Sequence, residues 1–175
     1  MLISQNIVTA LIFIPLALSI TYMDVRYRRI PNKHVLTILL CGIAVNAFFG
    51  SWQGIFASVV GLLMAFGLML TLHVLGTMGA GDVKLFAAIG AVIGSSLVLQ
   101  TFVIIAVTGG VLAIFKMVYE RRAAATMFRV GQFFVGLLPG QTVPRLSIPA
   151  DPTYTLPYAV PIVVGSVISF FLFRV

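Results

Sequence analysis

The sequence predicts an all-α fold, a polytopic membrane bundle of about six transmembrane helices. Of its 175 residues, 61% are hydrophobic and only 9% are charged, whereas a soluble domain carries about 25% charged residues. Residues 1–23, 34–81, 85–115 and 152–173 contain no Asp, Glu, Lys or Arg, and a bilayer span needs only ~20 such residues. These observations exclude a soluble fold, and the chain length predicts one membrane-embedded domain over residues 1–175.

Glycine, proline and charged residues divide the chain into six apolar segments, each of which we expect to form a helix. They cover residues 2–22, 34–49, 54–75, 83–96, 98–118 and 156–173. The first is expected to be retained, because Asp24 and Arg26 follow it and no basic residue precedes it, the reverse of a secretory signal. The fourth reaches only ~21 Å, short of the ~30 Å hydrocarbon core, so it should be tilted, buried or surrounded by a locally thinned bilayer.

Small residues recur every four positions in the third and fourth segments. Ala57, Gly61 and Ala65 form one such row, and Gly90 and Gly94 form the other. Rows of this kind predict faces on which helix backbones approach closely. The region 120–155 has no clean apolar run and contains several prolines, so we expect a surface helix followed by an irregular strap along the membrane interface.

The basic residues predict the orientation of the bundle, because short cytoplasmic loops collect Lys and Arg. If six spans alternate and the N-terminus lies outside, only Arg174 of the 11 basic residues falls on the outer side. The net charge of +7 is therefore expected to face lipid headgroups, and nucleic acid is not an expected partner. The basic residues expected on the inner side are Arg26, Arg28, Arg29, Lys33, Lys84, Lys116, Arg121, Arg122, Arg129 and Arg145.

Only four acidic residues occur, and two of them stand at predicted helix ends. Asp24 follows the first apolar segment, and Asp82 precedes the fourth. Because the two segments between them cross the membrane out and back, both carboxylates reach the same, inner face. Glu120 and Asp151 are expected to be solvated loop charges.

If Asp24 and Asp82 meet, their chemistry suggests a function. Two adjacent carboxyl groups cannot both ionise readily, so the pair holds one proton near neutrality. One group can then activate a water that attacks a peptide carbonyl, while the other polarises the carbonyl oxygen and protonates the leaving nitrogen. Gly79 and Gly81 would let a substrate strand lie against the loop, and Lys84 is a candidate for supporting the site.

Other interpretations of these residues remain open. Asp82 could simply cap a helix, and Asp24 could pair with Arg26 or Arg28 at the interface. The same acids could relay protons in a small transporter, or serve only structurally in a noncatalytic membrane subunit. His34 and His73 lack the spacing of a zinc protease, and Cys41 is the single cysteine, so neither a metal nor another cofactor is expected.

The motifs around the two acids resemble those of the type IV prepilin peptidases, which are Gly-x-Gly-Asp membrane aspartic proteases. Residues 79–85, Gly-Ala-Gly-Asp-Val-Lys-Leu, match the second catalytic motif of that family. Asp24 with Ile30-Pro31-Asn32 matches the first motif, and Leu156-Pro157-Tyr158 resembles the start of the last helix.

This resemblance implies a multi-pass endopeptidase of the bacterial inner membrane. Such an enzyme would use Asp24 and Asp82 to cut the basic leader from pilin or pseudopilin precursors at the cytoplasmic face. The chain starts in a helix and has one cysteine, so it resembles the short peptidases of Flp or tight-adherence pilus systems, without the methyltransferase domain of larger members. Two alternative functions remain beside this resemblance, namely a small proton-coupled transporter and a noncatalytic membrane subunit of a pilus or secretion system.

Overall fold

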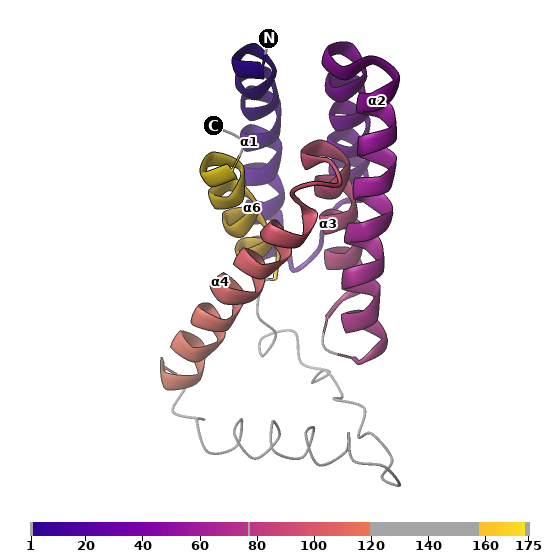
Figure 1. Ribbon diagram of the computed structural model, residues 1–175. Coiled ribbons are helices and arrows are strands. Elements are labelled where there is room, and N and C mark those ends of the chain that lie inside the picture. Colours follow the sequence, from indigo (N-terminus) through magenta and orange to yellow (C-terminus); the bar gives the residue numbers. More distant parts are fainter. Residues whose placement is uncertain (1, 77, 120–157, 174–175) are drawn as a thin grey trace, which may run out of the picture.

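The computed structural model describes residues 2–76, 78–119 and 158–173, and these form a helical bundle (Figure 1). The helices are α1 (Leu2–Tyr27), α2 (Asn32–Val74), α3 (Ala80–Ile93), α4 (Val98–Tyr119) and α6 (Ala159–Phe173). No strand occurs within these described ranges. The predicted all-α membrane bundle is therefore confirmed, whereas the expectations for the region 120–155 and for Leu156-Pro157 concern residues outside the described part.

Helix α2 consists of two antiparallel limbs joined at Ser51. Ser51 has φ 51° and ψ −138°, which lies outside the helical region. The Nδ2 atom of Asn46 donates a hydrogen bond of 2.8 Å to Oγ of Ser58, although residues twelve apart on a straight helix would lie ~18 Å apart. The two limbs, residues 32–50 and 52–74, correspond to the second and third segments expected from the sequence.

Among the residues that the structure describes, three helices are long and apolar enough to cross a membrane, namely Ser4–Tyr27, Asn32–Val74 and Val98–Phe115. Helix α6 is a shorter apolar helix. Eleven of the 14 residues of α3 are buried, so α3 is surrounded mainly by the other helices and does not need to match the bilayer thickness. The chain is a multi-pass membrane protein.

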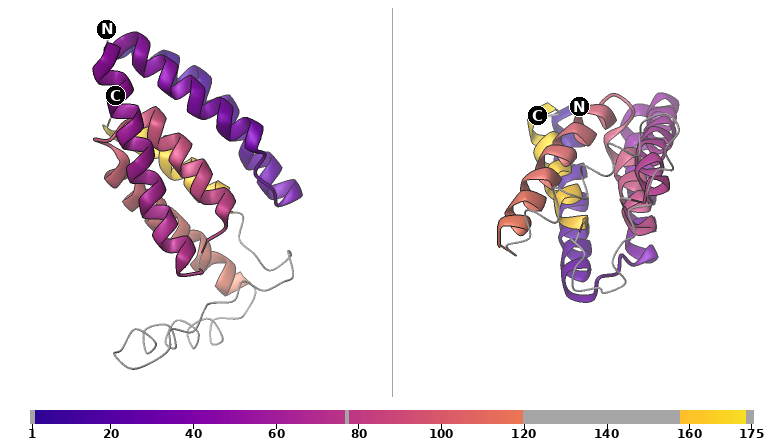
Figure 2. Two further views of the ribbon diagram at one scale, coloured as in Figure 1. Left: turned by 90° about the vertical axis from the view of Figure 1, so that its right-hand side faces the viewer. Right: turned by 90° about the horizontal axis from the view of Figure 1, so that it is seen from below.

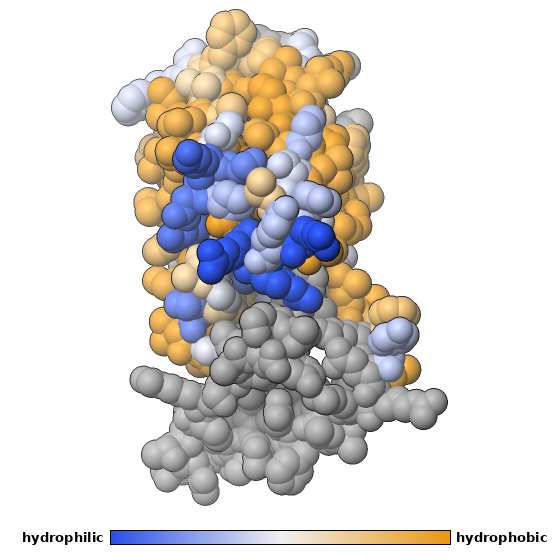
Figure 3. Space-filling view, turned by 180° about the vertical axis from the view of Figure 1, so that it is seen from behind, coloured by the Kyte–Doolittle hydropathy of each residue, from blue (hydrophilic) through white to orange (hydrophobic). Residues whose placement is uncertain are grey.

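The surface divides into an apolar and a hydrophilic part, as Figure 3 shows for one face. Hydrophobic side chains cover most of the described surface on this face, which is the composition that a lipid environment favours. Hydrophilic side chains gather in a patch next to the residues drawn in grey. The exposed basic side chains that follow the acid-bearing turn of α1 are those of Arg26, Arg28, Arg29 and Lys33.

Helix α3 packs most extensively against α2, and Figure 2 shows the two side by side in both views. Gly61 of α2 and Gly90 of α3 face each other so closely that a Cβ atom on either would overlap the carbonyl oxygen of the other. Ala65 contacts Gly90 and Ala57 contacts Gly94 in the same seam. The two rows of small residues therefore form one interface, which agrees with the sequence pattern.

A buried asparagine is hydrogen-bonded to the C-terminal end of α3. Asn46 accepts a hydrogen bond of 3.0 Å from Gln5 of α1. Its amide nitrogen lies 2.9 Å from the carbonyl oxygen of Ala91 and 3.1 Å from that of Val92. These carbonyls belong to the last turn of α3, where no intrahelical donor is available. Asn46 thus ties α3 to α1 and α2 at one level of the bundle.

The helices alternate in direction, so the end of α1 and the starts of α3 and α6 lie at the same end of the bundle (Figure 1). The helix boundaries next to the two acids differ from the sequence expectation. Helix α1 continues to Tyr27 and α3 already begins at Ala80, so Asp24 and Asp82 lie within helices. The apolar runs ended at the first charge, whereas backbone hydrogen bonds continue through charged residues.

Gly61→Ala should destabilise the bundle because the added methyl group pushes α2 and α3 apart, at a cost of about 1–3 kcal/mol. Gly67 lies on the same limb with nothing within 4 Å of an added Cβ. Gly67→Ala is the matched control and should leave the melting temperature unchanged or higher, because alanine favours helix. Circular dichroism melts in detergent compare the two variants, and equal Tm values would contradict the close approach.

Candidate active site

Asp24 lies in the last turn of α1 and is only 8% exposed. Its Oδ2 atom accepts a hydrogen bond of 3.2 Å from the backbone N–H of Ala159, the first residue of α6. The guanidinium group of Arg28 also interacts electrostatically with this carboxylate. Asp24 is therefore held between the end of α1 and the beginning of α6. Its interaction with Arg28 agrees with the alternative, raised from the sequence, that Asp24 pairs with a neighbouring arginine.

Asp82 lies in the first turn of α3 and is also 8% exposed. Its Oδ2 atom accepts a hydrogen bond of 3.3 Å from the N–H of Gly79, which is the N-cap residue. Asp82 thus occupies the third helical position and not the N-cap, although it still satisfies a free N–H of the helix start. A Cβ atom on Gly79 would lie 3.2 Å from Oδ2 of Asp82, so glycine leaves room for the carboxylate to fold back.

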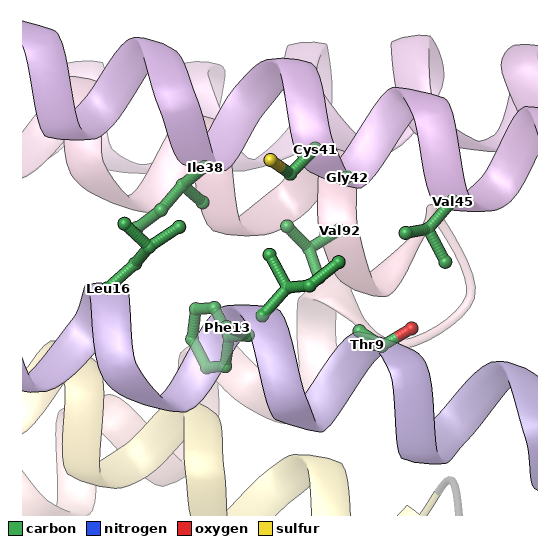
Figure 4. A pocket seen from close by; sticks show the side chains of 9 residues that line it. Thr9, Phe13, Leu16, Ile38, Cys41, Gly42, Val45 and Val92 are labelled. Atoms are coloured by element: carbon green, nitrogen blue, oxygen red, sulfur yellow. The ribbon is translucent and has the colours of Figure 1, made fainter.

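The helix lengths bring the two acids to the same level. Figure 4 shows Phe13 of α1 and Val92 of α3 facing the same small pocket. Asp24 lies eleven residues beyond Phe13, and Asp82 lies ten residues before Val92. At about 1.5 Å per residue these stretches span ~16 Å and ~15 Å. Because α1 and α3 run in opposite directions, both acids reach the same end of the bundle.

The chain segments next to the two acids also touch. Ile30 lies in the connection between α1 and α2, shortly after Asp24. A Cβ atom on Gly81 would lie 3.4 Å from Cδ1 of Ile30, which is an ordinary van der Waals contact. Gly81 therefore packs on Ile30, and the two sequence motifs that contain the acids meet in space.

The electrostatics of Asp82 depend on this meeting. Burial raises the pKa of Asp82, and the charge of Asp24 raises it further, so that the pKa reaches about 7 despite the hydrogen bond from Gly79. Asp82 lies outside the three long apolar helices. The pKa of Tyr158 is also raised, first by burial and then by the charge of Asp82. Asp24, Asp82 and Tyr158 thus form one electrostatic cluster, in which the pKa of Asp82 lies close to neutral pH.

A cavity of about 230 Å³ adjoins this cluster between α2, α4 and α6. Tyr158 forms part of its wall, and so does Met78, the residue before Gly79. Gly109 and Gly110 of α4 are also in the lining, which is otherwise mostly apolar. The site therefore combines a pair of carboxyl groups with an adjoining space suited to apolar groups.

Lys84 is exposed on α3, and residues two positions apart on a helix do not face each other. It therefore lies on a different side of the helix from Asp82. Within the described ranges, no group of three His, Cys, Asp or Glu side chains could hold a metal ion. Sequence reasoning missed the N–H of Ala159, because a backbone donor leaves no signal in residue identity.

A model of the type IV leader peptidase family matches residues 11–114 of the chain, a range that includes both acids, all of α3 and most of α1. The chain belongs to the type IV leader peptidase family. Assignment to this family agrees with the resemblance found in the motifs around Asp24 and Asp82.

Two curated relatives are similar to this leader peptidase family member. A prepilin leader peptidase/N-methyltransferase of Bacillus subtilis (strain 168) is 30% identical over 103 residues, which cover 57% of this chain and 41% of the relative. A protein of the same name from Legionella pneumophila is 28% identical over 130 residues, covering 71% and 45%. The chain thus matches less than half the length of either relative. No solved structure matches the chain.

Asp24→Asn should lower the pKa of Asp82, because it removes a negative charge next to a buried carboxyl group. Burial should still keep this pKa above its ordinary value. The rate at which a carbodiimide labels Asp82, followed by mass spectrometry over a pH series, reports the protonated fraction. An unchanged labelling midpoint in the variant would mean that the two acids are not coupled.

Proposed function

We propose that this chain is an aspartic endopeptidase that removes the leader from pilin or pseudopilin precursors, with Asp24 and Asp82 as its catalytic pair. The observation that carries the proposal is the electrostatic coupling of two buried carboxyl groups from distant parts of the sequence. A pKa of about 7 at Asp82 lets the pair hold one proton at physiological pH, which aspartic catalysis requires.

In the proposed reaction, Asp82 holds the shared proton and Asp24 acts as the base. Asp24 takes a proton from a water molecule as the water oxygen bonds to the scissile carbonyl carbon. Asp82 donates its proton to the carbonyl oxygen and so stabilises the tetrahedral intermediate. As the carbon–nitrogen bond breaks, Asp24 gives the proton that it took to the leaving nitrogen, and Asp82 takes back a proton from a hydroxyl of the intermediate. The products are a carboxylic acid and an amine, and the pair again holds one proton.

The surroundings of the pair fit a substrate with one polar and one apolar part. The apolar cavity beside Tyr158 would accommodate residues of the hydrophobic segment that follows the leader. Gly79 and Gly81 are candidates for backbone contact with the substrate. The two glycines lie at the start of α3, beside Asp82. Lys84 is exposed on another side of α3 and is a candidate for supporting the site.

We further propose that the acids face the cytoplasm and that the N-terminus lies outside the bacterial inner membrane. Supporting this orientation, Arg26, Arg28, Arg29 and Lys33 follow Asp24 in the chain, and cytoplasmic loops concentrate such residues. The resemblance to the short peptidases of tight-adherence pili makes an Flp-type pilin precursor the first substrate to test.

Asp24→Asn and Asp82→Asn should each abolish maturation of a co-expressed precursor, with a loss of at least roughly a thousandfold in rate, because the amide can neither hold the shared proton nor act as base. The shift of the precursor on immunoblots measures maturation. The matched controls are Glu120→Gln and Asp151→Asn, which neutralise the remaining two acids and should retain activity. Normal maturation in either active-site variant would refute the mechanism.

Cleavage by the purified enzyme should decline as the pH rises above about 7, because Asp82 then loses the proton that it must donate. A raised pKa means that the acid is protonated below this pH and ionised above it. Initial rates measured in detergent from pH 5 to 9, with one precursor peptide, give the midpoint of the decline. A rate that stays constant up to pH 9 would contradict the assignment of Asp82 as the acid.

A further inference from the structure

One peptide group next to Asp82 is hydrogen-bonded on both of its sides. The carbonyl oxygen of Met78 lies 2.7 Å from Nδ1 of His73, at the end of α2. The N–H of the same peptide group belongs to Gly79 and donates to Oδ2 of Asp82. A carbonyl oxygen can only accept a hydrogen bond, so Nδ1 of His73 must carry the hydrogen.

This arrangement joins the imidazole and the carboxyl group through a single rigid plane. The atoms of a peptide group rotate together, so a bond to its carbonyl also directs its N–H. The connection between α2 and α3 spans only a few residues, and His73 bonds the peptide group that leads into the N-cap residue Gly79. A donor on the carbonyl also polarises the peptide group and strengthens the bond that its N–H makes.

As a consequence, the two carboxyl oxygens of Asp82 are not equivalent. Oδ2 accepts the N–H of Gly79, which leaves Oδ1 as the oxygen to hold a proton. A carboxyl group with one oxygen occupied by the backbone cannot rotate freely. Asp82 can then present its proton in one direction.

We propose that His73 is a positioning residue for Asp82, acting through the Met78–Gly79 peptide group to fix which carboxyl oxygen donates the proton. This inference rests on the proposed function for its effect on catalysis. His73 itself makes its described hydrogen bond to the loop, so it is not proposed to touch the substrate.

Other titratable groups lie on the elements around Asp82 and must be kept constant in a test. Asp24 faces it from α1, and Tyr158 faces it from the start of α6. Lys84 lies two positions further along α3. Substitutions at His73 leave all three side chains in place, so a change in the titration of Asp82 can be assigned to the peptide group.

The test compares His73→Phe and His73→Leu, which lack a donor, with His73→Asn, whose amide nitrogen can reach the position of Nδ1. In the two variants without a donor, we expect kcat to fall roughly tenfold, as for the loss of one hydrogen bond, with KM for the precursor changing less than twofold. The alkaline limb of the pH profile should move to higher pH, because a weaker N–H bond stabilises the ionised carboxylate less. His73→Asn should restore both values to within about threefold of wild type.

Thr71→Val is the control for changes at the same end of α2. Its hydroxyl donates to the carbonyl oxygen of Gly67 in its own helix, and the variant should behave as wild type. Melting temperatures identify which His73 variants are folded, and either variant without a donor suffices. Unchanged kcat and pH midpoint in such a folded variant would overturn the proposal, as would a folded His73→Asn that fails like the others.

Carbodiimide labelling of Asp82 separates this inference from the proposed function. The labelling midpoint should rise in His73→Phe and return in His73→Asn, whether or not the protein cleaves a precursor. A wild-type protein that cleaves no pilin precursor would refute the proposed function, while the labelling result would still decide the role of His73. A midpoint that is the same in all variants would refute the role of His73 alone.

Discussion

The close approach of α2 and α3 at Gly61 and Gly90 is the contact on which the arrangement depends. In a bilayer, lipid tails solvate apolar side chains as well as other helices do, so helix association relies on tight packing and on hydrogen bonds between helices. The glycine pair provides the packing, and Asn46 provides hydrogen bonds to the neighbouring carbonyl oxygens in the last turn of α3. Together they hold a short helix inside the bundle, where its first turn can carry a buried carboxyl group.

Burial gives that carboxyl group its chemical character. In water an aspartic acid is ionised at neutral pH, whereas burial and the charge of Asp24 bring Asp82 close to half protonation. Backbone N–H groups balance this effect by bonding one oxygen of each acid. The fold therefore supplies both the desolvation that keeps a proton on the pair and the donors that keep the carboxyl groups oriented.

Much of this arrangement could be predicted from the sequence, because it follows from the apolar segments and the positions of the charged residues. The helix order, the small-residue seam of Gly61 and Gly90, and the placement of Asp24 and Asp82 at one end of the bundle all agree with the structure. The exact helix ends were not accessible, because an apolar run stops at a charge and a helix does not. Residue identity also cannot show that Ala159 donates its N–H or that His73 bonds a loop carbonyl.

The hairpin in α2 has a consequence for biogenesis. Only Ser51 leaves the helical conformation between two apolar limbs, and no charged residue lies within residues 34–81. A turn this short leaves no polar loop that could be translocated separately, and the backbone of each limb is already satisfied by its own helix. We therefore expect the two limbs to enter the lipid phase together as a helical hairpin, against which α3 can then pack.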